Sequence, residues 1–283
     1  MAQQRFPPAT LYVIATPIGN IGDISIRALH VLSLADAVAC EDTRNTGTLI
    51  AQYGLSKTLI AAHQHNEREV AERLIARLRQ GERIALVSDA GTPGVSDPGA
   101  RIVDAVLSAG LRVVPLPGAS AVVTALSAGG LVNDHFHFVG FLPAKASQRN
   151  SALQDLKDEN ATMVFYEAPH RIVETVEAMA NILGPVRQIV IARELTKLFE
   201  EIHRCPMSEA VNWLNADKKH IKGEFVLLVE GAHETVGTQD AEAERVLSIL
   251  LKELPVSKAA SLASRITGAK KNLLYERALK MKE

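Results

Sequence analysis

Short apolar runs rich in Val and Ile alternate with stretches of helical period over residues 10–130, and this alternation constrains the fold more than any other feature. Repeated strand–helix–strand units of this kind build a mostly parallel sheet covered by helices. The predicted strands lie at residues 11–15, 37–40, 58–62, 84–88 and 112–116, and the predicted helices at 25–34, 67–79, 98–108 and 119–128. We therefore expect an open α/β sheet in the first half of the chain.

The pattern changes from about residue 133, where strand candidates follow one another with shorter connections. Strands are predicted at residues 135–141, 162–166, 188–193, 200–204 and 224–229, and helices at 147–158, 170–183 and 208–215. Strands that are close in sequence can pair antiparallel. The predicted fold class is α/β, with an N-terminal α/β domain over residues 1–131 and a second α/β domain over residues 132–232.

The C-terminal segment differs from both halves in charge. Residues 231–241 are polar, contain glycine and lack apolar periodicity, which is typical of a linker. Residues 252–282 then contain eight basic and two acidic side chains, a local net charge of +6, so the rest of the chain carries about −7. We predict a small helical domain over residues 241–283, in which two short helices flank a turn at Thr267 and Gly268. Such a helix-turn-helix shape either binds nucleic acid or packs on the body to cover an apolar seam.

Composition excludes several classes of protein. Hydrophobic residues make up 47% and charged residues 22%, which is typical of a folded soluble protein. The net charge of −1 lacks the cationic excess of a chain that binds nucleic acid over its whole surface. Cys40 and Cys205 are too few for a disulfide framework or a thiolate zinc site. Since the sequence contains neither an export signal nor about 18 consecutive apolar residues, we expect a cytoplasmic protein without a membrane span.

Three loops follow predicted strands and open predicted helices: residues 15–23, 88–99 and 115–120. Ligands of open α/β sheets bind beyond the carboxyl ends of the strands, so these loops are expected to outline one pocket. Neither a dinucleotide fingerprint nor a G-x-x-x-x-G-K-[ST] phosphate loop occurs in the sequence. Asp89 is a candidate to accept hydrogen bonds from a ligand, whereas Asp97, just before Pro98, is expected to cap the following helix. Ser120 is predicted either to cap the following helix or to form part of the pocket.

Two polar clusters follow strands, at residues 40–46 and 192–201, and each mixes carboxylates with Arg or Lys. They either face a cleft between the domains or form surface ion pairs. The pairs His63 with His65 and His135 with His137 have the spacing of two ligands on one strand face. No third ligand follows at a suitable spacing, so no metal site is predicted.

Eight motifs in order carry a family resemblance: TPIGNIGDIS, CEDTR, HNE, SDAGTPGVSDPG, PLPGAS, FYEAPHRI, ARELTKLFEE and KGEFVLLVEG. Together they resemble the ribosomal RNA small subunit methyltransferase I family over about residues 10–231, and the basic tail resembles that family's C-terminal helical domain. The resemblance implies the tetrapyrrole methylase fold, with two α/β domains and a small C-terminal helical domain. It also implies S-adenosylmethionine as cofactor and methylation of a cytidine ribose 2′-hydroxyl in the decoding region of small-subunit (16S) rRNA.

The resemblance also implies which residues contact the cofactor. Carried over by position, they are Pro17, Ile18, Gly19, Asn20, Asp89, Ala90, Gly91, Gly94, Val95, Pro117, Gly118, Ala119, Ser120, Phe165, Tyr166 and Ala168. Most of them belong to the three loops singled out above. The implied partners are small-subunit rRNA or the assembled 30S subunit, and a second copy of the chain in a homodimer.

Transfer of a methyl group from a sulfonium needs alignment and a group that handles the hydroxyl proton, and it needs no metal. The candidates for this catalytic role are Asp42, Glu167, Glu194 and Lys197, because each stands beside a predicted strand end. The expected phosphate contacts are Arg44, Arg171, Arg193, Lys270 and Lys271. Two alternatives remain open: a methyltransferase acting on a tetrapyrrole, and a noncatalytic nucleotide-sensing module whose tail binds RNA.

Overall fold

The computed structural model describes residues 4–63, 66–232 and 236–281. The chain divides into two compact units, Met1–Lys157 with Ala161–Glu230 and Asp158–Asn160 with Gly231–Glu283. Within the described residues, no helix is both long and apolar enough to cross a membrane. The first unit contains two five-stranded sheets, and the second contains helices. The α/β fold class with a helical C-terminal domain is thus confirmed, while the boundary proposed between residues 131 and 132 stays a prediction.

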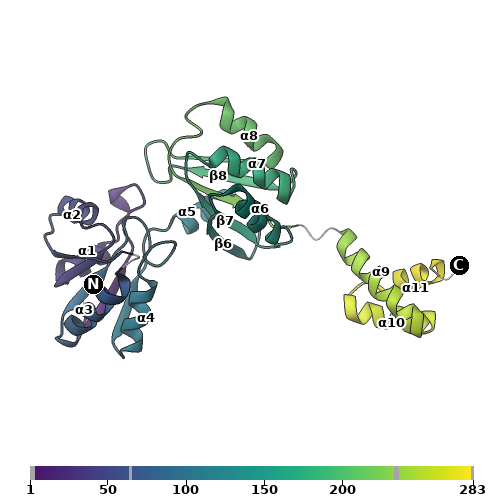
Figure 1. Cartoon of the computed structure of the whole chain (residues 1–283), viewed down its shortest axis with the longest axis horizontal. Helices are drawn as coiled ribbons and strands as arrows, with labels where there is room; N and C mark the ends of the chain where they lie inside the picture. Colours follow the sequence, from purple (N-terminus) through teal and green to yellow (C-terminus); the bar gives the residue numbers. More distant parts are fainter. Residues whose placement is uncertain (1–3, 64–65, 233–235, 282–283) are drawn as a thin grey trace. The chain divides into compact units, whose positions relative to one another are not determined.

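The first sheet is parallel throughout, as the alternation of strands and helices predicts. Its strands are β1 (Thr10–Ile14), β2 (Ala37–Cys40), β3 (Thr58–Ala61), β4 (Arg83–Leu86) and β5 (Arg112–Leu116), in the order β3-β2-β4-β1-β5. Figure 1 labels the helices of this part of the chain. The helices between the strands are α1 (Ile26–Leu34), α2 (Thr43–Gln52), α3 (Glu67–Arg79) and α4 (Ala100–Ser108), with a short 3-10 helix at Ile21–Asp23. Every β-to-α loop therefore leaves the sheet at the same edge.

The inner strands β1, β2 and β4 of the first sheet are buried on both faces, to which successive residues of a strand point in turn. Leu11 of β1 packs with α3 and α4, whereas Tyr12 and Ile14 pack with α1. All three side chains are at most 1% exposed. A strand buried on both faces reads as a continuous apolar run, which explains why these strands could be predicted from the sequence.

The second sheet is mixed. Its strands are β6 (Phe136–Phe141), β7 (Thr162–Glu167), β8 (Gln188–Arg193), β9 (Glu201–Pro206) and β10 (Phe225–Val229), in the order β6-β7-β10-β8-β9. β6 and β7 pair parallel, and the other three pairings are antiparallel. Helices α6 (Ala146–Asp155), α7 (Ile172–Leu183) and α8 (Met207–Ala216) pack on one face.

Helix α5 (Ala121–Gly129) joins the two sheets, since it follows β5 of the first sheet but packs on the second. Its Val122 and Ala125 contact the face of the second sheet that carries Val164 and Val190. Gly129 comes so close to this sheet that a Cβ there would lie 2.3 Å from Leu228 Cδ1. The carboxyl edge of the first sheet is thereby held against the second sheet within one unit.

The helical unit contains α9 (Val236–Glu253), α10 (Val256–Thr267) and α11 (Lys271–Lys280). Its core consists mainly of alanines, with Leu247 and Leu274 as the large members. Gly268 ends α10 in the left-handed conformation with φ 75°, which glycine adopts without strain and which confirms the predicted turn. Leu262, Ile266, Leu273 and Leu279 lie on the two predicted helices, but all four side chains are at least 40% exposed.

Two sequence predictions were wrong in part. Helix α2 was not predicted, because most of its side chains are polar and only Thr46 and Ile50 of this helix are buried. Helix α9 begins at Val236, so residues 236–241 are helical and not a linker, while residues 233–235 lie outside the described residues. Residues 231–241 are polar and contain glycine, so no apolar periodicity marks where this helix begins.

Candidate active site

Hydrogen bonds tie the three predicted loops to one another at the carboxyl edge of the first sheet. The backbone amides of Thr16 and Gly91 donate to each other's carbonyl oxygens at 2.9 and 3.0 Å. The Thr16 hydroxyl donates to the Ser88 carbonyl at 3.0 Å, and the Thr92 hydroxyl donates to the Ala119 carbonyl at 3.1 Å. The loops therefore form one rigid frame, as expected from their position after parallel strands.

Two glycines permit close approach around this frame. A Cβ on Gly118 would lie 2.8 Å from Ala15 Cβ, so only glycine lets the third loop lie against the first. A Cβ on Gly19 would lie 2.5 Å from Lys197 Cγ, which belongs to the loop after β8. Gly19 thus lets the first loop approach the predicted cluster of residues 192–201 on the second sheet.

A cavity of about 380 Å³ lies between the loop frame and the second sheet. This volume is within the range of about 300–1,000 Å³ that small-molecule sites occupy. The first half of the chain contributes Ile18, Ala90, Gly91, Thr92, Val95, Ser96, Asp97, Ser120 and Ala121 to its lining, and the second half contributes Phe141, Tyr166, Glu167, Ala168, Pro169, Leu195, Glu224, Phe225 and Val226. The lining is mostly apolar, with three carboxylates.

The cavity brings together part of the predicted cofactor set. The members in its lining are Ile18, Ala90, Gly91, Val95, Ser120, Tyr166 and Ala168. Outside the lining, Pro17, Gly19, Asn20, Gly94, Pro117, Gly118 and Ala119 belong to the supporting loops. Phe165 is fully buried in the core of the second sheet, because it points to the face opposite Tyr166. Its side chain therefore does not fit the predicted cofactor contact.

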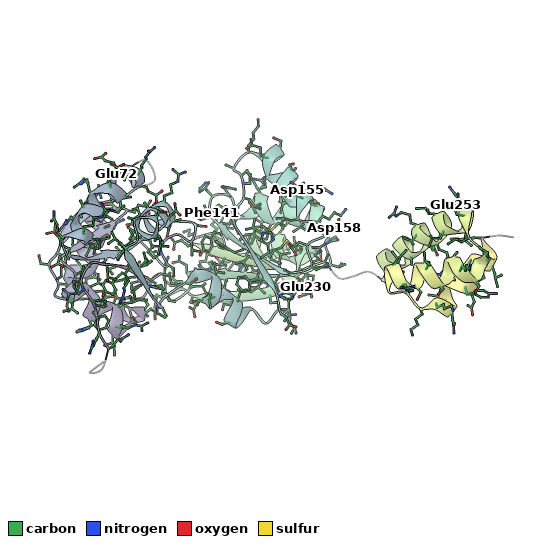
Figure 2. The ribbon with its side chains drawn as sticks, turned by 90° about the horizontal axis from the view of Figure 1, so that it is seen from below. Glu72, Phe141, Asp155, Asp158, Glu230 and Glu253 are labelled. Atoms are coloured by element: carbon green, nitrogen blue, oxygen red, sulfur yellow. The ribbon has the colours of Figure 1, made fainter. Side chains whose placement is uncertain are left out.

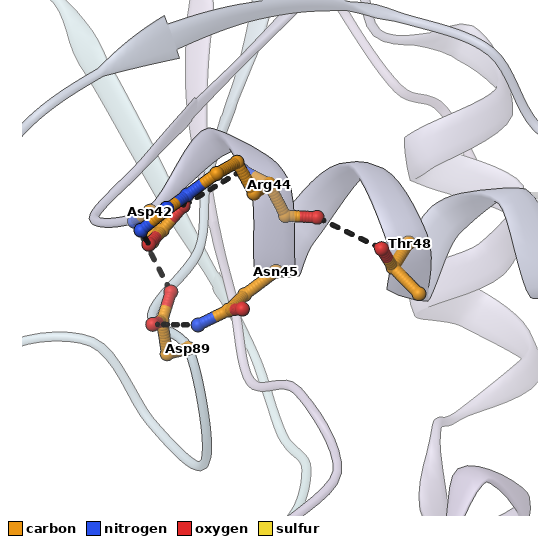
Figure 3. A network of polar contacts seen from close by, with 5 residues as sticks. All are labelled: Asp42, Arg44, Asn45, Thr48 and Asp89. Atoms are coloured by element: carbon orange, nitrogen blue, oxygen red, sulfur yellow. Dashed lines mark hydrogen bonds and ion pairs between the residues drawn. The ribbon is translucent and has the colours of Figure 1, made fainter.

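The carboxylates at the start of α2 are engaged in local structure (Figure 3). Asp42 is the N-cap of α2: its Oδ1 accepts from the Arg44 amide at 2.8 Å, and its Oδ2 pairs with the Arg44 guanidinium at 2.6 Å. The hydrogen bonds from the Arg44 side chain and backbone lower the pKa of Asp42 to about 2. Asp89 accepts from the Asp42 amide at 3.2 Å and from the Asn45 side chain at 2.7 Å. Neither Asp42 nor Asp89 lines the cavity.

Glu167 lines the cavity, but both of its oxygens have internal partners. Oε2 accepts from the Thr175 hydroxyl at 2.6 Å, and Oε1 accepts from the Ala168 amide at 2.8 Å. Arg171 lies 3.4 Å from Oε1 and also donates to the Leu142 carbonyl at 2.7 Å. These contacts join the end of β7 to the start of α7. They argue against a proton-accepting role for Glu167 and a phosphate contact by Arg171.

Glu194 and Lys197 form a second polar group with Glu224 at the end of β8. Lys197 Nζ lies 2.9 Å from Glu194 Oε1 and 2.8 Å from Glu224 Oε2. Burial opposes the charged form of each partner, but the ion pairs and hydrogen bonds prevail, lowering the pKa of Glu194 and raising that of Lys197. Lys197 is therefore a cation at neutral pH. Of these three residues, Glu224 lines the cavity.

The backbone of this loop is constrained. Glu194 and Thr196 have φ values of 51° and 66°, which side chains other than glycine rarely adopt. A Cβ on Gly223 would lie 2.4 Å from Glu194 Cγ, so glycine is needed opposite the strained loop. The constrained backbone holds Leu195 in the cavity wall.

The predicted phosphate-binding cations fall into two groups. Arg193 is 7% exposed and pairs with Glu201 at 3.0 Å, so its position argues against a phosphate contact, as with Arg171. Arg44 has an 89% exposed side chain, and Lys270 and Lys271 are exposed at the start of α11. These three cations are accessible to a polyanion.

Asp97 lines the cavity, although the sequence predicted that it caps the following helix. It does not cap α4, because the N-cap is Gly99, and the amide of Gly99 donates to Glu67 Oε1 at 2.6 Å. Burial and the nearby negative charge of Glu41 raise the pKa of Asp97 to about 6. The sequence signal was present as the second Asp of SDAGTPGVSDPG, but the Asp-Pro pair favoured the cap.

The lining suits a flat, cationic organic ligand. Phe141, labelled in Figure 2, and Tyr166 lie edge to face with ring centroids 5.5 Å apart, and their aromatic surfaces can contact a ring or a cation. Asp97 and Glu224 add negative charge. Among the residues that the structure describes, no three His, Cys, Asp or Glu side chains gather in a way that could hold a metal ion.

Comparison with known proteins agrees with this architecture. The model of the family "Tetrapyrrole (Corrin/Porphyrin) Methylases" matches residues 10–211, and the "RsmI C-terminal HTH domain" matches residues 237–282. Solved structures with the same fold include a uroporphyrin-III C-methyltransferase of Thermus thermophilus complexed with S-adenyl homocysteine, with a TM-score of 0.55 and 16% identity, covering 78% of this chain and 97% of that one. A diphthine synthase gives a TM-score of 0.58 at 18% identity and covers 78% of this chain and 90% of that one. The chain thus has the fold of these structures and belongs to the tetrapyrrole methylase family, whose model covers more than half of it.

Curated relatives narrow the assignment. The "Ribosomal RNA small subunit methyltransferase I" of Escherichia coli O157:H7 is 49% identical over 95% of this chain and 94% of its own length. The protein of the same name from Pseudomonas aeruginosa is 51% identical, over 95% of this chain and 96% of its own length. The chain belongs to the ribosomal RNA small subunit methyltransferase I family.

Proposed function

We propose that this protein transfers the methyl group of S-adenosylmethionine to the ribose 2′-hydroxyl of a cytidine in the decoding region of small-subunit 16S rRNA. The observation that carries the proposal is the cavity between the loop frame and the second sheet, in a chain about half identical to proteins named as rRNA methyltransferases. S-adenosylmethionine is the methyl donor, and it supplies a methyl group activated by a positively charged sulfur.

The residues of the cavity account for binding and orientation of the donor. Ala90 and Gly91 form a stretch of wall with little side chain, and the rings of Phe141 and Tyr166 give apolar surfaces for a base and for a cation. Ile18, Val95 and Leu195 add further apolar surface to the cavity wall. The rigid frame around Thr16 and Gly91 fixes these groups before the ligand arrives, and such alignment contributes much of the acceleration in a bimolecular transfer.

The basic C-terminal unit supports an RNA substrate. Lys270 and Lys271 are exposed at the start of α11, where positive side chains oppose the helix dipole and so do not stabilise the helix. An approaching phosphate would pair with both lysines and with the amides of the first helical turn. Together with Arg44, they are the proposed contacts to rRNA or the 30S subunit.

A homodimer is part of the proposal. Leu198 and Phe199, in the loop after β8, are 89% and 66% exposed. Two adjacent large apolar side chains on a surface are typical of a contact region. Sedimentation of the wild type and of Leu198→Ser tests this point, because the variant is expected to shift the population toward monomer, and an unchanged distribution would contradict it.

Methyl transfer from labelled S-adenosylmethionine to small subunits that lack the modification tests the function. Nuclease mapping of the product is expected to give one cytidine with a methylated ribose. Uroporphyrinogen is offered as a second acceptor in parallel. Labelling of the tetrapyrrole alone, or cofactor binding with no transfer to either acceptor, would contradict the proposal and favour the tetrapyrrole or the sensor alternative.

A further inference from the structure

The loop between β4 and α4 contains Asp97, a carboxylate that does not cap the following helix. Gly99 is the N-cap of α4, and its amide donates a hydrogen bond to Glu67 Oε1 of α3 at 2.6 Å. Gly99 itself has a φ of 126°, and a Cβ there would lie 3.3 Å from Leu86 Cδ2. The helix start is therefore built by Gly99 and Glu67, and Asp97 is not needed for it.

The position of Asp97 in the cavity wall is enforced from both sheets. Its neighbour Ser96 has a φ of 61° and lies opposite Gly140 of β6, where a Cβ would be 3.2 Å from Ser96 Oγ. Close approach of β6 thus covers the loop and leaves Asp97 partly buried along the cavity. A strained conformation that the surroundings hold in place is often found at functional sites.

The groups that face Asp97 come from several elements and carry no positive charge. Glu41 follows β2, Ser88 and Asp89 follow β4, and Tyr166 comes from β7. Burial and the charges of Glu41 and Asp89 disfavour the ionised carboxylate, while the Ser88 hydroxyl favours it. Asp97 in turn raises the pKa of Tyr166, secondary to burial of that ring. Within the described residues, none of the groups that shift the pKa of Asp97 is a cation.

The other two carboxylates of the cavity are already engaged. Both oxygens of Glu167 accept hydrogen bonds from Ala168 and Thr175, and Arg171 lies beside them. Glu224 accepts from Lys197 at 2.8 Å. Oxygens that already accept these hydrogen bonds are less available to a substrate hydroxyl. Asp97 is thus the lining carboxylate best suited to accept a proton.

We infer that Asp97 is the catalytic proton acceptor for the hydroxyl that receives the methyl group. As the ribose 2′-oxygen forms its bond to the methyl carbon, the bond from that carbon to sulfur breaks and its electron pair stays on the sulfur, which becomes a neutral thioether. The 2′-hydroxyl proton passes to Asp97 Oδ, which becomes a neutral carboxylic acid. The assignment rests on the proposed function.

The electrostatics of the site suit this task. A pKa of about 6 leaves most Asp97 side chains ionised at neutral pH and still basic enough to share a proton in the transition state. A cationic methyl donor in the same cavity favours the ionised carboxylate, so binding of the donor would increase the fraction of Asp97 that can accept a proton.

Single-turnover methyl transfer to small subunits, measured from pH 5 to 8, tests the inference. With S-adenosylmethionine kept below its Kd, the rate reports the pKa of the free protein, so the wild-type rate is expected to rise with an apparent pKa near 6. Asp97→Asn is expected to lose about 100-fold or more of the rate at pH 7.5 and to lose this dependence. Asp97→Glu, which keeps the carboxylate, is expected to retain more of the rate than Asp97→Asn. Asp104→Asn, an exposed Asp of α4, is the matched control and is expected to behave as the wild type.

A binding measurement gives a readout independent of turnover. Calorimetry at pH 6 in buffers of different ionisation enthalpy reports the protons released on binding. Because about half of the Asp97 side chains are protonated at this pH, S-adenosylmethionine is expected to release up to about half a proton more than neutral S-adenosylhomocysteine. Asp97→Asn is expected to bind both ligands and to abolish the difference.

The outcomes separate this inference from the proposed function. If the wild type methylates the ribose and Asp97→Asn keeps both its rate within about threefold and its pH profile, Asp97 is not the proton acceptor and the proposed function stands. If the wild type methylates no ribose, the function and the assignment of Asp97 both fail. An equal release of protons by wild type and Asp97→Asn would also overturn the assignment.

Discussion

The start of helix α2 and the loop from Ser88 to Gly99 lie at the same edge of the first sheet, but the pKa values of Asp42 and Asp97 in them shift in opposite directions. Asp42, at the helix start, caps α2 and pairs with Arg44, and its pKa falls to about 2 (Figure 3). Asp97, in the loop, faces Glu41 and a mostly apolar cavity, and its pKa rises to about 6. Both residues are aspartates in loops that follow strands of the same sheet, so the neighbouring groups decide which carboxylate stabilises the fold and which is available for chemistry.

The arginines extend this comparison. Arg171 has a 17% exposed side chain beside the fully buried Glu167, whereas Arg44 is 89% exposed beside Asp42. Arg171→Met is expected to lower the free energy of unfolding by about 3 kcal/mol, because it leaves a buried carboxylate without its cation. Arg44→Met, the matched variant, is expected to change it by less than about 1 kcal/mol. Urea unfolding at pH 7 measures both, and equal losses would contradict the distinction.

A smaller effect is expected at the frame that supports the cavity. Gly118→Ala places a Cβ 2.8 Å from Ala15 Cβ, where neither backbone can yield without moving a loop. We expect about a tenfold loss of S-adenosylmethionine affinity, which corresponds to about 1.4 kcal/mol. Gly47→Ala, within helix α2, is the control and is expected to bind normally. Calorimetric titration distinguishes them, and unchanged affinity in Gly118→Ala would show that the third loop does not shape the site.

The lowered pKa of Asp42 predicts how its contribution to the free energy of unfolding changes at acid pH. Its folded pKa of about 2 lies below the usual 3.8, so its contribution to stability is present above pH 3.8 and is lost as the pH falls toward 2. Asp42→Asn is expected to unfold at lower denaturant concentration than the wild type at pH 6, with the difference shrinking toward pH 2. Chemical unfolding over this range measures the effect. A difference that does not vary with pH would show that the Asp42 charge is not stabilised in the fold.

The smallest expected change concerns the exposed cations of the helical unit. Replacing Lys270 and Lys271 together by Gln is expected to reduce the slope of log affinity against log salt for an rRNA fragment by about 1.5. The same exchange at Lys218 and Lys219, exposed residues of the body, serves as the control for net charge. Fluorescence anisotropy at several KCl concentrations gives both slopes. Equal slopes would assign the basic helices to packing.

Much of the fold could be predicted because the inner strands β1, β2 and β4 of the first sheet are buried on both faces and the edge strand β5 still contains a short apolar run. Residues 37–40 and 112–116 match β2 and β5 in both bounds, and helix α3 matches its predicted range of 67–79. Helix α2 was not predicted because Thr46 and Ile50 are its only buried residues. Patterns of hydrophobicity report burial, so an element with a narrow buried face gives a weak signal.

The site was predictable as a set of loops and less so as a set of side chains. The frame formed by Thr16, Gly91 and Ala119 follows from strand ends that meet at one edge of a parallel sheet. Which side chain points into the cavity depends on contacts between distant segments. Gly99 is the N-cap in place of Asp97, and its amide donates to Glu67, 32 residues before Gly99 in the sequence, so no local pattern records this contact.

The most direct test of the contrast between the two aspartates is a carboxyl ¹³C NMR titration of the wild type labelled at aspartate, with signals assigned from Asp42→Asn and Asp97→Asn. The account predicts that the Asp42 signal titrates near pH 2 and the Asp97 signal near pH 6. An Asp97 signal that titrates near the usual value of 3.8 would contradict it, because Asp97 would then differ little from an ordinary surface aspartate.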